Sequence, residues 1–160
     1  MIQTDILIIG AGPVGLFTVF EAGLMKLRCH IIDAIPQAGG QLTEIYPKKP
    51  IYDIPGFPRV LAGELIENLL EQAAPFKPGF TLGERAEAID KQKDGSFIVT
   101  TSEGTKHQAP VVMIAGGLGS FEPRKPKIEN LQQFEKKGVE YMVREPESFI
   151  GKKIFISGGG

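Results

Sequence analysis

Three glycines near the N-terminus have the spacing of a turn that binds phosphate. Gly10, Gly12 and Gly15 form a G-x-G-x-x-G pattern, which follows one apolar run and opens another. In such a pattern the first glycine makes a tight turn, the second lets the backbone approach a pyrophosphate, and the third lets a helix pack closely on a strand. The N–H groups at the start of the helix also attract phosphate. We therefore predict a dinucleotide-binding site; a glycine-rich turn that binds nothing is the less favoured interpretation.

An acidic residue follows at the distance that such a site requires. Asp33 ends the second predicted strand, at roughly the 20-residue spacing from the glycines that is typical of these sites. A carboxylate here can accept a hydrogen bond from a ribose hydroxyl, whereas it would repel a 2′-phosphate. The site is thus expected to hold FAD or NAD. Replacing Asp33 by Ala is expected to weaken binding and to leave the fold largely intact. The alternative is a solvated Asp that merely ends a strand.

A predicted βαβ unit positions the glycines and Asp33. Residues 5–9 are apolar on both faces, which is typical of a central strand in a parallel sheet, and residues 28–32 are predicted to form the second strand. The helix between them continues to about Gly23 and, because it is mostly apolar, is expected to be covered on most sides. Apolar spacing predicts an amphipathic helix over 61–73. A β-meander and then one further buried strand are predicted over 80–82, 86–91, 96–101, 105–108 and 111–115.

A long segment of irregular sequence, 34–59, separates the second strand from the second helix. It contains five prolines and begins near a Gly39-Gly40-Gln41 run. Structureless segments of this length in compact domains are usually functional. The Gly-Gly-Gln run suits a second close approach of backbone to a long cofactor. Together with the meander and a second glycine run at 158–160, this segment favours FAD over NAD, because two nucleotide sites suit a flavin that exchanges electrons with a nicotinamide.

Composition excludes several other classes of function. The 160 residues carry a net charge of −1, without the basic surface of a nucleic-acid-binding protein. No apolar run approaches the roughly 18 residues of a membrane-spanning helix, and a cytoplasmic protein is expected. Cys29 is the one cysteine and is expected to be a small buried apolar residue. His30 and His107 lack metal-ligand spacing, so no metal site is predicted.

Several segments, taken together, resemble the thioredoxin-reductase-like (type 2) ferredoxin–NADP reductases, and the resemblance extends along the whole chain. The first of them is shared by many flavoproteins, whereas the others are far more specific to this family. The segments are IIGAGPVGLF at 8–17, GGQL at 39–42, IYP at 45–47, IYDIPGFP at 51–58 and FEPRK at 121–125. The resemblance implies an α/β fold: a Rossmann-like three-layer FAD-binding domain with a parallel sheet and a β-meander, and then the truncated start of an NADP-binding domain.

The resemblance also implies which residues line the FAD site. Tyr46 would stack on or border the isoalloxazine, Gln41 would hydrogen-bond to the ribityl chain or ring, and Ala86 would present its backbone to the adenine edge. We nominate no catalytic side chain, because the flavin itself carries the electrons. The complete candidate set is Gly10, Gly12, Val14, Gly15, Asp33, Gly40, Gln41, Tyr46, Ala86 and Phe121.

The family's chemistry would be hydride transfer from NADPH to FAD, and then single-electron transfer to or from ferredoxin or flavodoxin. In this interpretation 1–116 is the N-terminal part of the FAD-binding domain, 117–127 a linker, and 128–160 the start of the NADP-binding domain, with strands at 139–143 and 153–156. The NADPH site would be incomplete, so the chain alone is expected to be inactive. Relatives are commonly homodimers.

Two other functions stay open at this point. A thioredoxin reductase has a similar fold but needs a CxxC pair, which would lie beyond residue 160. A non-catalytic module that only binds a dinucleotide is the second alternative. Five basic side chains could steer an acidic ferredoxin toward the protein. The favoured interpretation is that they simply lie in a solvated loop and a solvated linker. They are Lys48, Lys49, Arg124, Lys125 and Lys127.

Overall fold

The chain divides into two compact units, Met1–Glu122 and Pro123–Gly160. The computed structural model describes residues 1–119, 125–135, 137–141, 143 and 146–158. The division falls inside the segment that the sequence predicts to be a linker, 117–127. Which unit binds which cofactor remains a prediction.

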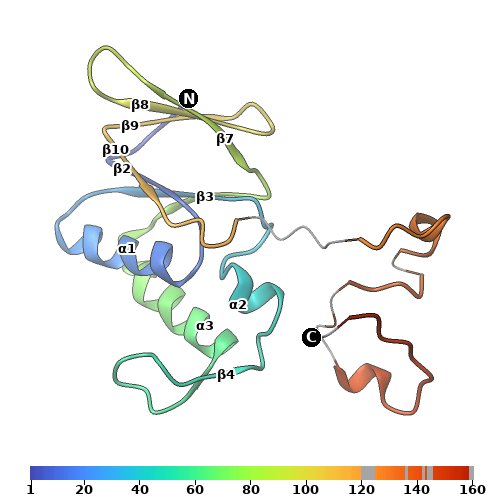
Figure 1. Ribbon diagram of the computed structural model, residues 1–160. Coiled ribbons are helices and arrows are strands. Elements are labelled where there is room, and N and C mark those ends of the chain that lie inside the picture. The colour runs from blue at the N-terminus through green and yellow to red at the C-terminus, as the bar shows by residue number, and fades with distance from the viewer. Residues whose placement is uncertain (120–124, 136, 142, 144–145, 159–160) are drawn as a thin grey trace. The chain divides into compact units, whose positions relative to one another are not determined.

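The first unit contains two four-stranded sheets, stacked as two of its three layers (Figure 1). The parallel sheet has the order β10-β2-β3-β6, with β2 at Ile6–Ile9, β3 at Cys29–Asp33, β6 at Gly79–Leu82 and β10 at Val111–Ile114. The second sheet has the order β1-β9-β8-β7, with β1 at Ile2–Gln3, β7 at Ala86–Lys91, β8 at Phe97–Thr101 and β9 at Lys106–Ala109. Strands β7, β8 and β9 are antiparallel neighbours, so the predicted β-meander and the predicted α/β class are confirmed.

Two helices form the third layer, on the face of the parallel sheet opposite the meander (Figure 1). They are α1 (Pro13–Leu24) and α3 (Ala62–Ala73), which continues into a short 3₁₀ turn at Ala74–Phe76. The segment between β3 and α3 is less irregular than predicted, because it contains the short helix α2 (Gln41–Glu44) and an antiparallel pair formed by β4 (Pro50–Ile51) and β5 (Val60–Leu61). None of the described helices is long and apolar enough to cross a membrane.

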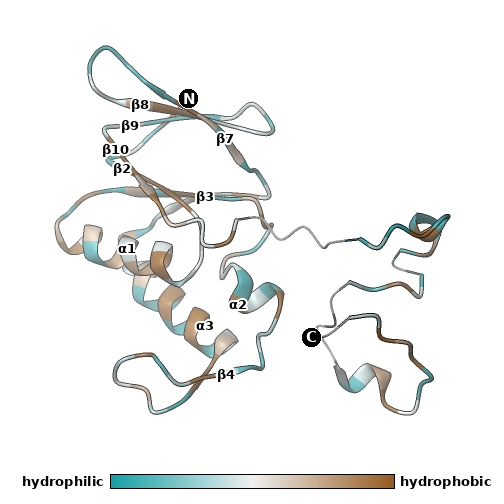
Figure 2. Cartoon of the chain, in the orientation of Figure 1, coloured by the Kyte–Doolittle hydropathy of each residue, from teal (hydrophilic) through white to brown (hydrophobic). Residues whose placement is uncertain are grey.

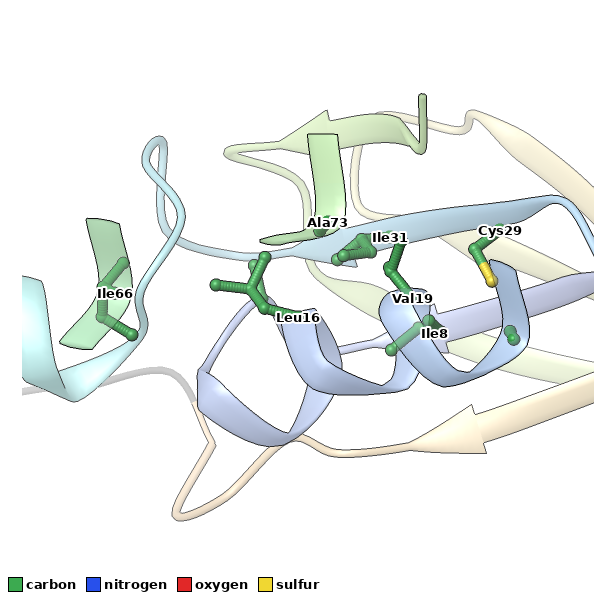
Figure 3. Close-up of a cluster of buried hydrophobic side chains, with 9 residues drawn as sticks. Ile8, Leu16, Val19, Cys29, Ile31, Ile66 and Ala73 are labelled. Atoms are coloured by element: carbon green, nitrogen blue, oxygen red, sulfur yellow. The ribbon is translucent and has the colours of Figure 1, made fainter. Parts of the chain in front are cut away.

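Apolar side chains on both faces of β2 and β3 explain why this sheet is sandwiched. Successive side chains of a strand point to opposite faces. Ile8 and Ile31 therefore join the core beneath α1 and α3 (Figure 3), whereas Leu7 and Ile32 join a second core against the meander. Along α3, apolar stretches alternate with polar ones, as expected for an amphipathic helix with one buried face (Figure 2). The core beneath the helices is completed by Ala11, Leu16, Val19, Ala22, Cys29, Ile66 and Ala73.

Of two expectations about burial, one is confirmed and one is wrong. Helix α1 is covered on most sides, by the sheet, by α3 and by the 3₁₀ turn at Ala74–Phe76, and its exposed residues lie along one stripe that includes Val14. Strand β10 was predicted to be buried, but it lies at an edge of the parallel sheet, where Ile114 is 71% exposed. The segment of β10 is apolar all round, and a local pattern cannot tell a central strand from an edge strand. The described residues place no further strand beside β10.

The second unit, taken by itself, has little regular structure in its described residues. It contains 3₁₀ turns η2 (Leu131–Phe134) and η3 (Pro146–Phe149) and one isolated bridge between Glu135 and Val139. The strand predicted at 153–156 is not formed, and the described part of 139–143 contributes only the Val139 bridge. A strand needs hydrogen-bonded neighbours and a face to bury, and neither is present among the described residues of this unit.

Candidate dinucleotide-binding site

The turn between β2 and α1 needs glycine at its first position. Gly10 has a φ of +113°, and a Cβ built there would overlap the backbone carbonyl of Ala115, which directly follows the neighbouring strand β10. Its N–H donates to the carbonyl of Ile32 on the other neighbouring strand, at 2.8 Å. Gly10 is thus held between two strands in a conformation that side chains rarely adopt, which is the tight turn that the sequence predicted.

The other two glycines of the pattern differ sharply in what surrounds them. A Cβ on Gly15 would overlap the carbonyl oxygen of Gly10, so this glycine allows α1 to pack closely on the turn. A Cβ on Gly12, by contrast, would meet no described atom within 4 Å, and Gly12 has an ordinary extended backbone, with φ of −75°. The fold itself does not require glycine at Gly12. The residue instead leaves open space beside the backbone, which is what a closely approaching ligand needs.

The N-terminus of α1 opens directly onto this space. Gly12 is the N-cap and Pro13 the first helical residue; no side chain caps the helix and its first turn contains no acid. The first N–H groups of a helix lack partners within the helix and carry part of the helix dipole. Val14, predicted to line the site, is exposed in this first turn. The arrangement can therefore attract an anion such as a diphosphate.

Asp33 connects the glycine turn to the end of β3. One carboxylate oxygen accepts the N–H of Ala11 at 2.6 Å, and the other accepts the N–H of Ile35 at 2.8 Å. Each oxygen can accept a further hydrogen bond, so a ribose hydroxyl could still bind there. Two backbone N–H groups depend on the Asp33 carboxylate, so its removal would also leave these donors unsatisfied. That the fold stays largely intact without it remains a prediction.

The Gly39-Gly40 run folds back onto the glycine turn. The N–H of Gly39 donates to the carbonyl of Ala11 at 2.8 Å, and a Cβ on Gly40 would lie 3.4 Å from the Cα of Gly12. Gly40 also has a φ of +58° as it caps α2. The close approach observed here is to the chain's own backbone. Whether this run also approaches a cofactor stays a prediction.

Gln41 and Tyr46 lie at the two ends of α2. Gln41 is its first residue, and Tyr46 follows its end and borders a cavity of about 440 Å³. The ammonium group of Lys49 lies 5.0 Å from the centroid of the Tyr46 ring, in cation–π geometry. The cavity is lined by Leu42, Tyr46, Lys49, Pro50, Ile51, Tyr52 and Asp53. None of the glycines of the turn lines this cavity. The glycine turn and the cavity beside Tyr46 are therefore two separate features and do not form one continuous pocket.

The loop between β6 and β7 also reaches Asp33, which the sequence did not predict. The N–H of Glu84 donates to the carbonyl of Asp33, and the N–H of Gly83 to that of Ile35, each at 3.1 Å. Ala86 begins β7 just beyond this loop, and its half-buried side chain packs on the core beneath the meander. The sequence signal for this turn was the glycine at position 83, directly after the predicted strand at 80–82. In the structure Gly83 has a positive φ, as expected for such a turn.

Three of the sequence-based candidates lie at or beyond the end of the first unit. Phe121 lies outside the described residues, as does Arg124 of the basic set. Lys125 is held by both carboxylate oxygens of Glu135 at 2.9 Å, and this hydrogen bonding raises the pKa of the lysine. Its charge is thus already balanced by a carboxylate.

The chain is similar along its whole length to part of several curated proteins. No protein-family model matches the chain. Ferredoxin–NADP reductase 1 of Christiangramia forsetii is 73% identical over all 160 residues, which cover 45% of that protein. The ferredoxin–NADP reductase of Flavobacterium johnsoniae is 68% identical over 160 residues, or 46% of its length. The chain thus spans slightly under half the length of these curated relatives.

Among solved structures, similarity is found to a thioredoxin reductase. The crystal structure of the T. acidophilum enzyme matches 86% of this chain and 42% of that protein, with a TM-score of 0.66 and 22% identity. At this identity the match shows a shared fold. The resemblance that the motifs predicted is confirmed by the curated relatives: the chain is a homologue, along its whole length, of part of the ferredoxin–NADP reductases, in a fold that thioredoxin reductase shares.

Proposed function

We propose that the first unit binds FAD, with the diphosphate at the Gly12 turn and the adenosine ribose at Asp33. The observation that carries this proposal is the contrast between Gly15, whose surroundings are filled, and Gly12, whose surroundings are open. A turn that served packing alone would not need glycine at an ordinary φ with open space beside it. The high identity to ferredoxin–NADP reductases supports the same assignment.

The residues present fit a long dinucleotide. The uncapped start of α1 suits a diphosphate, and Asp33 retains acceptor capacity for a ribose hydroxyl. The cavity beside Tyr46 has room for part of an aromatic ring system and is bordered by two tyrosines and a lysine. Gln41, between these two features, is half-buried at the start of α2. These positions support Gln41 and Tyr46 as flavin-side contacts and Asp33 as an adenosine-side contact.

We further propose that the chain supplies this FAD site to an oxidoreductase that passes electrons between NADPH and ferredoxin or flavodoxin. Bound FAD would supply the conversion between two-electron and one-electron transfer. The chain's own residues would bind and orient the cofactor: Asp33 would hold the glycine turn in place through Ala11, and α2 would connect the turn to the Tyr46 cavity. The names of the curated relatives support this activity.

Two measurements test this proposal. The first titrates FAD into the chain and follows the quenching of flavin fluorescence; we expect one FAD per chain. The second uses a protein of full reductase length that contains this chain, and compares NADPH-dependent reduction of ferredoxin with that of a disulfide substrate. We expect ferredoxin to be reduced and the disulfide not. Preference for the disulfide would overturn the choice of acceptor, and absence of flavin in both proteins would overturn the proposal.

A further inference from the structure

Three buried polar side chains join the two sheets of the first unit. His30 on β3 and His107 on β9 both meet the hydroxyl of Thr81 on β6, through their Nε2 atoms, at 2.8 and 2.9 Å. The two imidazole rings lie 4.9 Å apart between centroids. His107 is 0% exposed, and His30 and Thr81 are buried too. Gly79, opposite His30 on β6, leaves room for the His30 ring, because a Cβ there would overlap it.

The direction of these two hydrogen bonds is determined by the single proton of the Thr81 hydroxyl and by the unpaired Nδ1 atom of His107. A threonine hydroxyl has one proton, so it can donate to only one of the two rings and must accept from the other. Nδ1 of His107 is buried and has no hydrogen-bond partner within the described residues. A buried donor without an acceptor costs more than a spare lone pair does. His107 therefore carries its proton on Nε2 and donates to Thr81, Thr81 donates to His30 Nε2, and His30 carries its proton on Nδ1.

Protonation of either ring would break this arrangement. A charged His107 would place an N–H on the buried Nδ1, where no described acceptor lies. A charged His30 would direct Nε2–H at a hydroxyl that already accepts from His107, and the proton of Thr81 would lose its acceptor. The chain of hydrogen bonds thus requires both imidazoles to be neutral.

The surroundings of the two rings also disfavour a positive charge. Burial, followed by the nearby His107, lowers the pKa of His30 to about 4. Burial likewise lowers the pKa of His107, against an opposing effect of the Glu84 carboxylate and with a smaller contribution from the N-terminal ammonium group. The Glu84 carboxylate in turn accepts a hydrogen bond from the hydroxyl of Thr101.

We propose that His30, Thr81 and His107 form an acid-sensitive latch that holds the meander sheet on the parallel sheet. It is closed while both imidazoles are neutral and opens when they bind protons. The latch lies just behind the predicted nucleotide site: Thr81 pairs with Ile32, the residue before Asp33. It does not depend on FAD, so its failure would leave the proposed function untouched, and the reverse also holds.

The sign of the pH effect follows from the two states. In the unfolded chain each imidazole titrates near its usual pKa of about 6.5. The folded chain takes up these protons only at lower pH, so it is fully stabilised above about pH 6.5 and loses stability as pH falls toward the folded pKa of His30, about 4. Within that window the ratio of folded to unfolded chain should fall roughly tenfold per pH unit through His30, and His107, whose pKa is also lowered, should add a loss of the same sign.

Nitrogen-15 NMR of the histidine rings in the 160-residue chain tests the latch directly. At pH 7.5 we expect His107 as the Nε2–H tautomer and His30 as the Nδ1–H tautomer, and both rings should remain neutral well below pH 6.5. The reverse tautomers would overturn the assigned direction. A ring that titrates near pH 6.5 while the chain stays folded would overturn the acid sensitivity.

Urea unfolding of variants between pH 8 and pH 5 supplies the second test. H30F and H107F each remove one titrating ring. H30F should reduce the acid-induced loss by roughly tenfold per pH unit below pH 6.5, and H107F should reduce it in the same direction. T81V, which keeps the shape and removes the hydroxyl, should abolish the fixed tautomers of both rings. Glu84→Gln is the control and should leave most of the pH dependence in place. Unchanged acid sensitivity in a folded H30F or H107F chain would overturn the proposal; if neither variant folds, the NMR titration decides.

Discussion

Apolar segments of similar composition form a buried strand in the first unit and an exposed segment without strand structure in the second. On β3 of the first unit, Ile31 and Ile32 are 0% exposed because strands lie on both sides and a core lies on both faces. In the second unit, Phe155 sits in the similar run 153–156, forms no strand and is 92% exposed. Both runs have the composition of a strand. The difference shows that such a pattern predicts a strand only where neighbouring strands are available to pair with it.

Substitution of one apolar residue in each unit should give the largest contrast. I31A should lower the free energy of unfolding by about 2–5 kcal/mol, because it leaves a cavity in the core under α1. The matched F155A should change it by less than about 0.5 kcal/mol, because the ring contacts so little. Urea unfolding followed by circular dichroism measures both. Equal losses would mean that 153–156 is packed in solution.

The same contrast between filled and open surroundings exists inside the first unit. G15A should destabilise the chain by about 1–3 kcal/mol, since its methyl group would overlap the Gly10 carbonyl and force α1 away from the turn. G12A should be within about 0.5 kcal/mol of the wild type, because its methyl group meets no described atom. Thermal unfolding of the two variants side by side is the check. A large loss in G12A would show that Gly12 serves packing after all.

Substitution of Asp33 should give an effect comparable with that of G15A, although the contacts of Asp33 are hydrogen bonds and no core is lost. D33N keeps one acceptor oxygen but turns an NH₂ group toward either the Ala11 or the Ile35 N–H. We expect a loss of about 1–3 kcal/mol in stability, from one unsatisfied N–H. Faster hydrogen exchange at Ala11 or Ile35, measured by NMR, would locate that loss. Unchanged exchange at both amides would contradict the observed hydrogen bonds.

Removal of the second unit should have the smallest effect. A chain ending at residue 122 retains every strand of both sheets and the helices α1, α2 and α3. We expect its free energy of unfolding to stay within about 0.5 kcal/mol of that of the 160-residue chain. A marked loss would mean that the two units stabilise each other.

Local patterns predicted most of the first unit. The strands β2, β3 and β6 to β9 and the helices α1 and α3 were placed within a residue or two, because periodicity and turn residues are local signals. The strand β1 was missed because its two residues pair with β9, more than 100 residues later. The edge position of β10 was missed because it depends on which strands lie beside it.

The candidate site divides in the same way. Spacing predicted Gly10, Gly12, Gly15 and Asp33, and the structure brings all four together. Spacing in the sequence could not predict that Asp33 would accept hydrogen bonds from backbone N–H groups, or that Gly40 would lie against Gly12. These contacts depend on how distant segments pack. The roles assigned to Tyr46 and Ala86 depended on the family resemblance, and a bound flavin is needed to test them.

Isothermal titration of FAD into the wild-type chain and into G12A tests the central claim most directly. If open space beside the Gly12 backbone admits the cofactor diphosphate, the wild type should bind one FAD and G12A should bind at least tenfold more weakly with its stability intact. If G12A binds FAD as tightly as the wild type, the diphosphate does not lie at this turn and the account of the site is wrong.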